Sequence, residues 1–239
     1  MNVLEVEGLC KTYPAFQLRD VSFSVRKGTI MGLIGRNGAG KTTTMKSLLN
    51  IVRADSGRVT CFGMDLREQE REIKQRIGFA GGAAEYFKKK RIGDILTVTK
   101  RFYADWDEQV CSQYLDLFAL DVDKTPSQLS QGMKVKLNLV LALSHKAELL
   151  ILDEPTSGLD PISREELLEI FRLLRSRGVS LLFSTHITSD LEKCADDITY
   201  IREGRAVYSG SLSGFTQGGS LDEVMLRYEK EAFRERLTV

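Results

Sequence analysis

The chain has 239 residues, of which 28% are charged and 42% are hydrophobic. Lysine and arginine total 34 and the acidic residues total 33, which gives a formal net charge of +1. This balance argues against a protein whose main task is to wrap nucleic acid, because such proteins carry a clear basic excess. At about 100–200 residues per domain, the length fits one large domain or one domain with a subdomain.

The cysteines and apolar runs exclude several classes of protein. Cys10, Cys61, Cys111 and Cys194 form no CxxC pair, so we expect reduced thiols inside a cell and no zinc site. The N-terminal residues include early acids and no apolar core, so they do not predict a signal peptide. Apolar runs such as Leu149–Leu152 are far shorter than the ~20 residues that span a bilayer.

The first third of the chain alternates strand and helix patterns. Alternating polarity over Asn2–Val6 and Val21–Val25 predicts antiparallel strands with one solvated face. The apolar run Thr29–Ile34 predicts a strand that is buried on both faces. The next predicted elements are a helix over Lys41–Val52, a strand over Arg58–Phe62 and a polar helix over Glu68–Arg76. This rhythm predicts an α/β fold with a mostly parallel sheet.

The middle of the chain is helical in pattern. Apolar residues at helical spacing predict a helix over Asp107–Phe118, with Asp105 as its start. We predict that residues 83–145 form a helical subdomain inserted into the α/β core. The later predicted elements are a helix over Met133–His145, a strand over Leu149–Leu152, a helix from Asp160-Pro161 to Gly178, a strand over Ser180–Ser184, and a helix over Leu221–Arg236 capped by Ser220 and Glu223.

The segment Gly35-Arg-Asn-Gly-Ala-Gly-Lys41-Thr42 matches the phosphate-loop pattern G-x-x-x-x-G-K-[ST]. It follows a predicted buried strand and precedes a predicted helix, as phosphate binding requires. Gly35, Gly38 and Gly40 let the backbone approach a phosphate, and the helix N-terminus favours an anion. Lys41 then reaches the outer phosphates and the Thr42 hydroxyl binds Mg²⁺. The alternative is a glycine-rich turn beside a solvated lysine.

Polar groups follow two further apolar strands. Asp153 and Glu154 end the strand at 149–152, and His186 follows the strand at 180–184. Ligands of parallel α/β sheets bind at the carboxyl ends of strands, so we expect Asp153 to hold Mg²⁺ and Glu154 to activate a water. The alternatives are ordinary loop carboxylates and a structural histidine. We expect His145 to be a cation at a helix C-terminus.

These motifs together resemble the ATP-binding subunit of ABC transporters, over residues 1 to about 215. The resemblance is carried by GRNGAGKTT at 35–43, LSQGM at 129–133, LLILDEPTSGLD at 149–160 and STH at 184–186. It implies a P-loop fold of the ABC ATPase type, with an antiparallel β subdomain. The implied division is an α/β core at 1–82 and 146–215, a helical subdomain at 83–145, and a C-terminal helical tail at 216–239. Residues 184–209 resemble bacterial ATPases that export drugs or antimicrobial peptides.

The resemblance also implies roles for individual residues. Tyr13 would stack on adenine, unless it is only a surface tyrosine. Glu154 would polarise the attacking water and His186 would contact the γ-phosphate. The residues that would contact the phosphates of the chain's own ATP are Gly35, Asn37, Gly38, Ala39, Gly40, Lys41, Thr42 and Thr43, and the Mg²⁺ ligands would be Thr42 and Asp153.

Three further residues would act between two subunits. Ser130 and Gly132 would bind the ATP of a second subunit, and Asp160 would lie at the boundary between the two. The alternative for Ser130 and Asp160 is a role as ordinary helix caps, and both roles are compatible.

Two departures from the family pattern concern its signature motif and its glutamine loop. The usual LSGGQ is LSQGM here, which puts fine affinity in doubt but not the assignment. The usual glutamine after residues 77–79 is absent. Gly82 lies near its place, and Glu85 is the candidate substitute. The basic run at 88–91 is either a solvated face or a contact for a membrane partner.

We therefore expect an ATPase that uses ATP and Mg²⁺, works with a transmembrane permease and a second ATP-binding subunit, and binds no nucleic acid. Its expected location is the cytoplasmic face of a bacterial membrane. One alternative is a regulatory nucleotide-binding module with weak ATPase activity. Another is a soluble ABC ATPase of DNA repair or the ribosome, which the absence of long heptads and of a basic excess disfavours.

Overall fold

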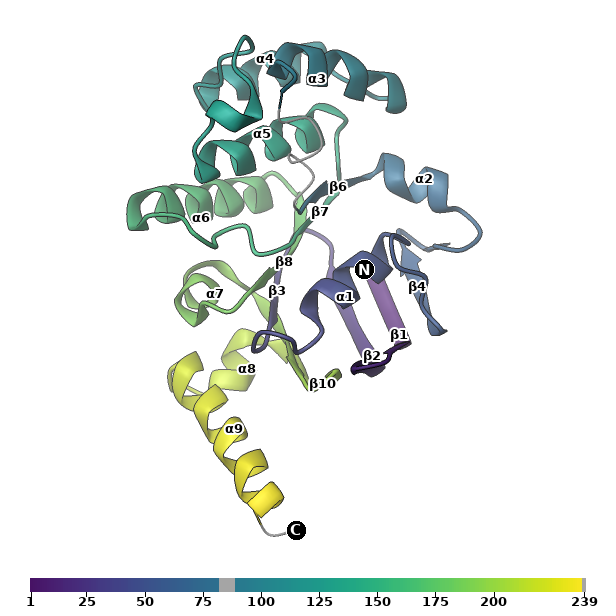
Figure 1. The fold of residues 1–239 in the computed structure, drawn as a ribbon, viewed down its shortest axis with the longest axis vertical. Coiled ribbons are helices and arrows are strands. Elements are labelled where there is room, and N and C mark those ends of the chain that lie inside the picture. Colours follow the sequence, from purple (N-terminus) through teal and green to yellow (C-terminus); the bar gives the residue numbers. More distant parts are fainter. Residues whose placement is uncertain (82–88, 238–239) are drawn as a thin grey trace.

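The computed structural model describes residues 1–81 and 89–237, and within these its strands form two sheets (Figure 1). The smaller sheet has the order β2-β1-β4-β5 and is antiparallel. Its strands are β1 (Asn2–Tyr13), β2 (Phe16–Arg26), β4 (Ser56–Cys61) and β5 (Met64–Asp65). The predicted antiparallel strands at the start of the chain are confirmed, and both are longer than predicted.

The larger sheet has the order β10-β9-β3-β8-β7-β6, in which only β10 runs antiparallel to its neighbour. Its strands are β3 (Ile30–Ile34), β6 (Ile77–Ala80), β7 (Leu149–Leu152), β8 (Ser180–Thr185), β9 (Asp197–Arg202) and β10 (Arg205–Ser211). The predicted α/β fold with a mostly parallel core sheet is confirmed.

The central strands are apolar throughout because both of their faces are covered. All residues of β3, β7 and β8 are buried. Leu150 and Leu152 pack into the core shared with helices α5 and α6, whereas Leu149 and Ile151 pack into the core shared with α1 and the antiparallel sheet. Successive residues of a strand point to opposite faces, so one apolar run serves two cores.

The predicted helices are present among the described residues with shifted ends. The helices of this part of the chain are α1 (Lys41–Leu48), α2 (Glu70–Gln75), α3 (Ile92–Thr99), α4 (Glu108–Leu117), α5 (Gln131–Ser144), α6 (Pro161–Ser176), α7 (Thr188–Cys194), α8 (Leu212–Thr216) and α9 (Leu221–Leu237), with short 3₁₀ turns at Lys100–Phe102 and Pro126–Gln128. Of these helices, α3, α7 and α8 were not predicted. Helix α1 ends before the predicted Val52, because Asn50 adopts a left-handed φ of 53°. The predicted cap of α9 is confirmed by hydrogen bonds between Ser220 and Glu223 in both directions.

The predicted start of α4 at Asp105 is wrong. Asp107 caps the helix instead, and its Oδ1 accepts hydrogen bonds from the backbone N–H groups of Gln109 and Val110, both at 3.1 Å. A cap must be followed directly by the helix, since its carboxylate has to reach the second and third amides. Asp105 lies two residues too early for that.

Helices α3, α4 and α5 gather at one end of the molecule, and α9 extends from the other end (Figure 1). Between β6 and β7, the regular elements that the structure describes are all helical. The predicted border of a helical subdomain at residue 83 lies outside the described residues, so the division into domains stays a prediction. Among the described residues, every helix is too short or too polar to cross a membrane.

His145 is a buried residue, and its predicted role as a charged group at a helix end is wrong. It follows α5, but its side chain is only 3% exposed and its ring stacks on Tyr103, with 3.7 Å between centroids. Nδ1 donates to the carbonyl oxygen of Gln75 over 3.1 Å. Burial lowers the pKa of His145, because desolvation disfavours the charged ring.

The lowered pKa of His145 predicts that the free energy of unfolding decreases as the pH is lowered. Below about pH 6.5 the unfolded chain binds a proton at this residue that the folded chain excludes, so the free energy of unfolding decreases as pH falls. A His145→Phe variant keeps a ring against Tyr103 and lacks the titration. Urea unfolding at pH 8 and pH 5.5 should show a smaller loss of stability in the variant. Equal losses in the two proteins would contradict the assignment.

Candidate functional site

The three predicted strand ends meet at one edge of the large sheet. Strand β8 lies between β3 and β7 and runs parallel to both, with Ile34 opposite Thr185 and Leu152 opposite Phe183. The loop after β3, the carboxylates after β7 and the histidine after β8 therefore emerge side by side. Residues more than 100 positions apart in the chain share one edge for this reason.

The loop between β3 and α1 is shaped by its glycines and by Lys41. Gly40 has a φ of 116°, a conformation that other residues rarely adopt. A Cβ atom at Gly35 would lie 2.2 Å from the carbonyl oxygen of Ile201, so only glycine fits there. Lys41 is 6% exposed, and its Nζ donates to the carbonyl oxygen of Gly35 over 2.8 Å. The lysine amine is thus held over the loop and out of water.

Glu154 joins the lysine of the loop to His186. Its Oε1 lies 3.3 Å from Lys41 Nζ, and its Oε2 lies 2.9 Å from His186 Nδ1. The backbone of Glu154 has a φ of 49°, which is uncommon for a residue with a side chain. Strained backbone of this kind is frequent where a side chain must be aimed at a site.

Asp153 points to the hydroxyls of two other elements. Its Oδ1 accepts a hydrogen bond from Ser184 Oγ over 2.6 Å and one from Thr42 Oγ1 over 3.3 Å. Ser184 Oγ in turn accepts the backbone N–H of Glu154 over 2.9 Å. A hydroxyl and a carboxylate at this spacing suit Mg²⁺, which takes oxygen ligands and usually binds through one or two carboxylates plus substrate phosphates.

Ser184 is a residue for which the sequence analysis gave no role beyond membership of a motif. It is fully buried at the end of an apolar strand. A polar residue buried in such a position needs a partner, and this is the signal that points to it. By bonding both groups, it fixes the carboxylate of Asp153 relative to the backbone of Glu154.

Most of the predicted site residues line one cleft of about 730 Å³. Its lining residues are Ala15, Phe16, Asn37, Gly38, Ala39, Gly40, Lys41, Thr42, Thr43, Glu154, Ser157 and His186. Gly35 and Asp153 are not among them, although Asp153 bonds the lining residue Thr42. The size fits a ligand of small-molecule dimensions, and the polar lining with one buried lysine suits an anionic one.

Tyr13 is not brought into the lining of this cleft. It ends β1, is 37% exposed, and has Lys11 Nζ 5.8 Å from its ring centroid. Phe16, directly opposite Tyr13 in the β1–β2 hairpin, lines the cleft instead. Phe16 was not predicted from the sequence. Its signal was an aromatic residue just across a short turn from the predicted one.

Ser130, Gly132 and Asp160 lie together but are not among the residues that line the cleft. Ser130 caps α5, and its Oγ accepts the backbone N–H of Met133 over 3.2 Å. Asp160 caps α6 in the same way through two amides at 3.0 Å. A Cβ at Gly132 would lie 3.6 Å from the side chain of Ser163, so the starts of α5 and α6 are neighbours. The capping roles are present, and a site for a second subunit stays a prediction.

The predicted departure of the glutamine loop lies outside the described residues. This applies to Gly82 and Glu85, and to Lys88 of the basic run. Arg91, which ends the run, pairs with Asp123 at 3.1 Å on an exposed surface.

Comparison with known proteins identifies close similarity to transporter subunits. A family model described as "ABC transporter" matches residues 18–157. The chain is 33% identical to the lantibiotic transport ATP-binding protein SrtF of Streptococcus pyogenes. The alignment covers 95% of this chain and 99% of that protein. The chain is also 32% identical to the bacitracin transport ATP-binding protein BcrA of Bacillus licheniformis, over 85% of this chain and 68% of that protein.

Solved structures give the same result for the fold. A solved structure of the ATP binding subunit of an ABC transporter superposes on this chain with a TM-score of 0.84 at 29% identity. The superposition covers 94% of this chain and 98% of the solved one. A dimeric ATP-binding cassette in a post-hydrolysis state with ADP and Pi has a TM-score of 0.77 at 18% identity, over 89% and 100% of the two chains.

The bonds of Ser184 predict its contribution to stability. Ser184→Ala removes a hydrogen bond to a carboxylate and leaves the backbone N–H of Glu154 without its acceptor. We expect the free energy of unfolding to fall by about 1.5–3 kcal/mol. The control is Ser176→Ala, the same change at an exposed position, which should cost less than about 0.5 kcal/mol. Urea titrations compare the two, and equal values would contradict the assigned role.

Proposed function

This chain belongs to the ABC transporter family as an ATP-binding subunit, and we propose that it hydrolyses ATP to power a separate transmembrane permease. The observation that carries the proposal is the cleft in which Lys41, Glu154 and His186 converge beside a glycine-rich loop. Each group comes from the end of a different strand, and each suits one part of a phosphoryl transfer to water.

Binding of the ATP phosphates is supported by the buried lysine. Lys41 Nζ lies between the carbonyl oxygen of Gly35 and the carboxylate of Glu154. A γ-phosphate offers a stronger negative charge and several acceptors, so it would draw the amine from Glu154. The carboxylate of Glu154 would then be released to act on water. In this way nucleotide binding at Lys41 would make the carboxylate of Glu154 available to accept a proton from water.

Thr42 and Asp153 fit a bound Mg²⁺ with their hydroxyl and carboxylate oxygens. The metal would neutralise charge on the β- and γ-phosphates. Ser184 holds Asp153 in place through its hydrogen bond, so the carboxylate is oriented before a ligand arrives.

The proposed reaction is attack of water on the γ-phosphorus, which breaks its bond to the bridging oxygen and gives ADP and phosphate. Glu154 accepts a hydrogen bond from this water and takes up its proton. His186 forms a hydrogen bond with Oε2 of Glu154, the carboxylate oxygen that does not contact Lys41. From this position it can orient both the carboxylate of Glu154 and the γ-phosphate. Most of the catalysis is then positioning and charge stabilisation.

A second ATP-binding subunit would complete the site. Ser130 and Gly132 are absent from the lining of this chain's own cleft, although the helix N-terminus that Ser130 caps suits a phosphate. We propose that these residues face the ATP of a partner subunit in a head-to-tail pair. The dimeric state of a structural neighbour supports the pairing of two subunits.

Export is the direction of transport that the relatives favour. They are named for bacitracin and lantibiotic transport, so we propose that the permease carries a drug or antimicrobial peptide out of the cell. The subunit would then lie on the cytoplasmic face of the membrane. A regulatory module with weak turnover is the second candidate, and the absence of the family's usual glutamine after residues 77–79 favours it.

The phosphate loop is tested by Lys41→Ala. Because the variant loses a charge-assisted contact to the phosphates, ATP affinity should fall by about tenfold or more in equilibrium dialysis. The control Lys46→Ala removes an exposed lysine from the same helix and should bind ATP as the wild type does. Retained affinity in Lys41→Ala would refute the role of the loop.

The proposed base is tested by Glu154→Gln. The amide cannot take up the proton of the attacking water, so turnover should fall by about 10²–10⁴-fold while ATP binding persists and a dimer accumulates. Glu169→Gln, at an exposed site on α6, is the control and should keep full turnover. Unchanged turnover in Glu154→Gln would exclude the assigned base. A wild type that turns over weakly even with its membrane partner would support the regulatory candidate.

A further inference from the structure

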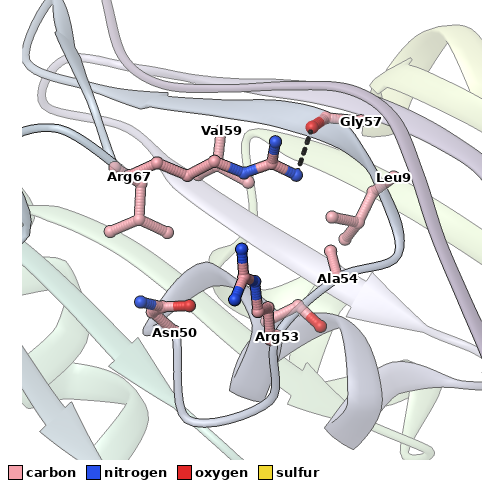
Figure 2. A pocket seen from close by; sticks show the side chains of 9 residues that line it. Leu9, Asn50, Arg53, Ala54, Gly57, Val59 and Arg67 are labelled. Carbon is pink, nitrogen blue, oxygen red and sulfur yellow. Dashed lines mark hydrogen bonds between the residues drawn. The ribbon is translucent and has the colours of Figure 1, made fainter.

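A second cavity, of about 190 Å³, lies at the opposite end of α1 from the phosphate loop. Figure 2 shows it between the segment that follows α1 and the antiparallel sheet. Its lining residues are Leu9, Ser47, Asn50, Arg53, Ala54, Gly57, Val59, Leu66 and Arg67. None of them lines the nucleotide cleft, so the two sites are separate.

Two arginine side chains from different loops line this cavity. Arg67 runs along one side of it toward Gly57, and the guanidinium of Arg53 lies on the facing side (Figure 2). Arg67 Nη2 donates to the carbonyl oxygen of Gly57 over 3.3 Å, and the guanidinium of Arg53 makes no hydrogen bond or ion pair with the residues that the structure describes. Like charges that face one space repel, and an anion between them removes the repulsion.

Two acidic residues beside the cavity are already paired. Asp65 binds Arg58 over 2.8 Å and also accepts the backbone N–H of Arg67. Glu70 holds Lys74 and the side-chain amide of Asn50. Among the residues that the structure describes, no carboxylate forms an ion pair with Arg53 or Arg67.

Ser47 forms part of the cavity wall and is buried. Its Oγ is enclosed by protein atoms, so it is part of the wall and is not a group that holds a ligand.

The remaining walls are apolar. Leu9, Val59 and Leu66 are buried and line the same space. A ligand that fills the cavity would thus combine an anionic head between the arginines with a short apolar body against the sheet. The small volume leaves room for only a few carbon atoms beyond the head.

We propose that this cavity binds a phosphoryl group, held by Arg53 and Arg67, at a site separate from the nucleotide cleft. One guanidinium satisfies the two oxygens of a carboxylate, whereas two guanidiniums on one cavity match the three oxygens and higher charge of a phosphate. The phosphoryl group belongs either to free phosphate or to a small phosphomonoester. Helix α1 runs from Lys41 of the nucleotide loop to the region of Ser47, so it joins the two sites.

Calorimetric titration tests this proposal, with the nucleotide cleft first filled by Mg²⁺ and a non-hydrolysable ATP analogue. Inorganic phosphate and butyl phosphate are titrated separately into the full chain. We expect one additional site for each probe. If a phosphomonoester is the natural ligand, butyl phosphate binds more tightly, by about fourfold for each methylene that becomes buried. Equal affinities indicate that free phosphate is the ligand.

Two variants and one control decide the outcome. Arg53→Ser with Arg67→Ser removes exposed side chains and should weaken phosphate binding by about tenfold or more. Ala54→Phe keeps both arginines and fills the cavity, and it should also abolish the additional site. Lys46→Ser removes an exposed cation from α1 outside the cavity and should bind as the wild type does. No additional site in the wild type, or equal binding in all variants, would overturn the proposal.

Discussion

The parallel pairing of β3, β8 and β7 is the constraint on which the rest of this structure depends. It places the carboxyl ends of three strands side by side, and each of these ends carries a different polar group. The strands can pair in this order because they are apolar on both faces, with one core on each side of the sheet. The proposed chemistry therefore depends on packing that occurs well away from the cleft.

Within the cleft, hydrogen bonds and charge pairs connect all three strand ends. Lys41 contacts Glu154, Glu154 contacts His186, and Ser184 bonds Asp153 and the backbone of Glu154. A buried lysine needs a counter-charge, and Glu154 supplies it in the absence of a phosphate. The carboxylate of Glu154 is thus paired with Lys41 until a nucleotide phosphate binds the lysine in its place. The same pairing that stabilises the fold would limit water activation without ATP.

The predictions from sequence were right where a residue acts through its neighbours in the chain. Six of the strands, the glycine loop and the caps of α5, α6 and α9 were predicted, and they depend on local backbone geometry and short-range hydrogen bonds. Strands β5, β6, β9 and β10 were not predicted. The predictions were wrong or incomplete where burial by distant elements decides. His145 follows a helix, but it becomes a neutral core residue because Tyr103 and Gln75 cover it. One miss is local: Phe16 lines the cleft, whereas Tyr13, opposite it in the β1–β2 hairpin, does not.

The sequence by itself determined the family, the α/β fold class and the candidate residues of the phosphate loop and strand ends. Those features reside in short motifs whose spacing is set by local chemistry. Only the tertiary structure decided which groups touch, such as Ser184 with Asp153, and that Arg53 and Arg67 face one cavity. The reason is that such contacts join residues on separate elements, so their distances depend on how the sheets and α1 pack together. No pattern along the chain carries that information.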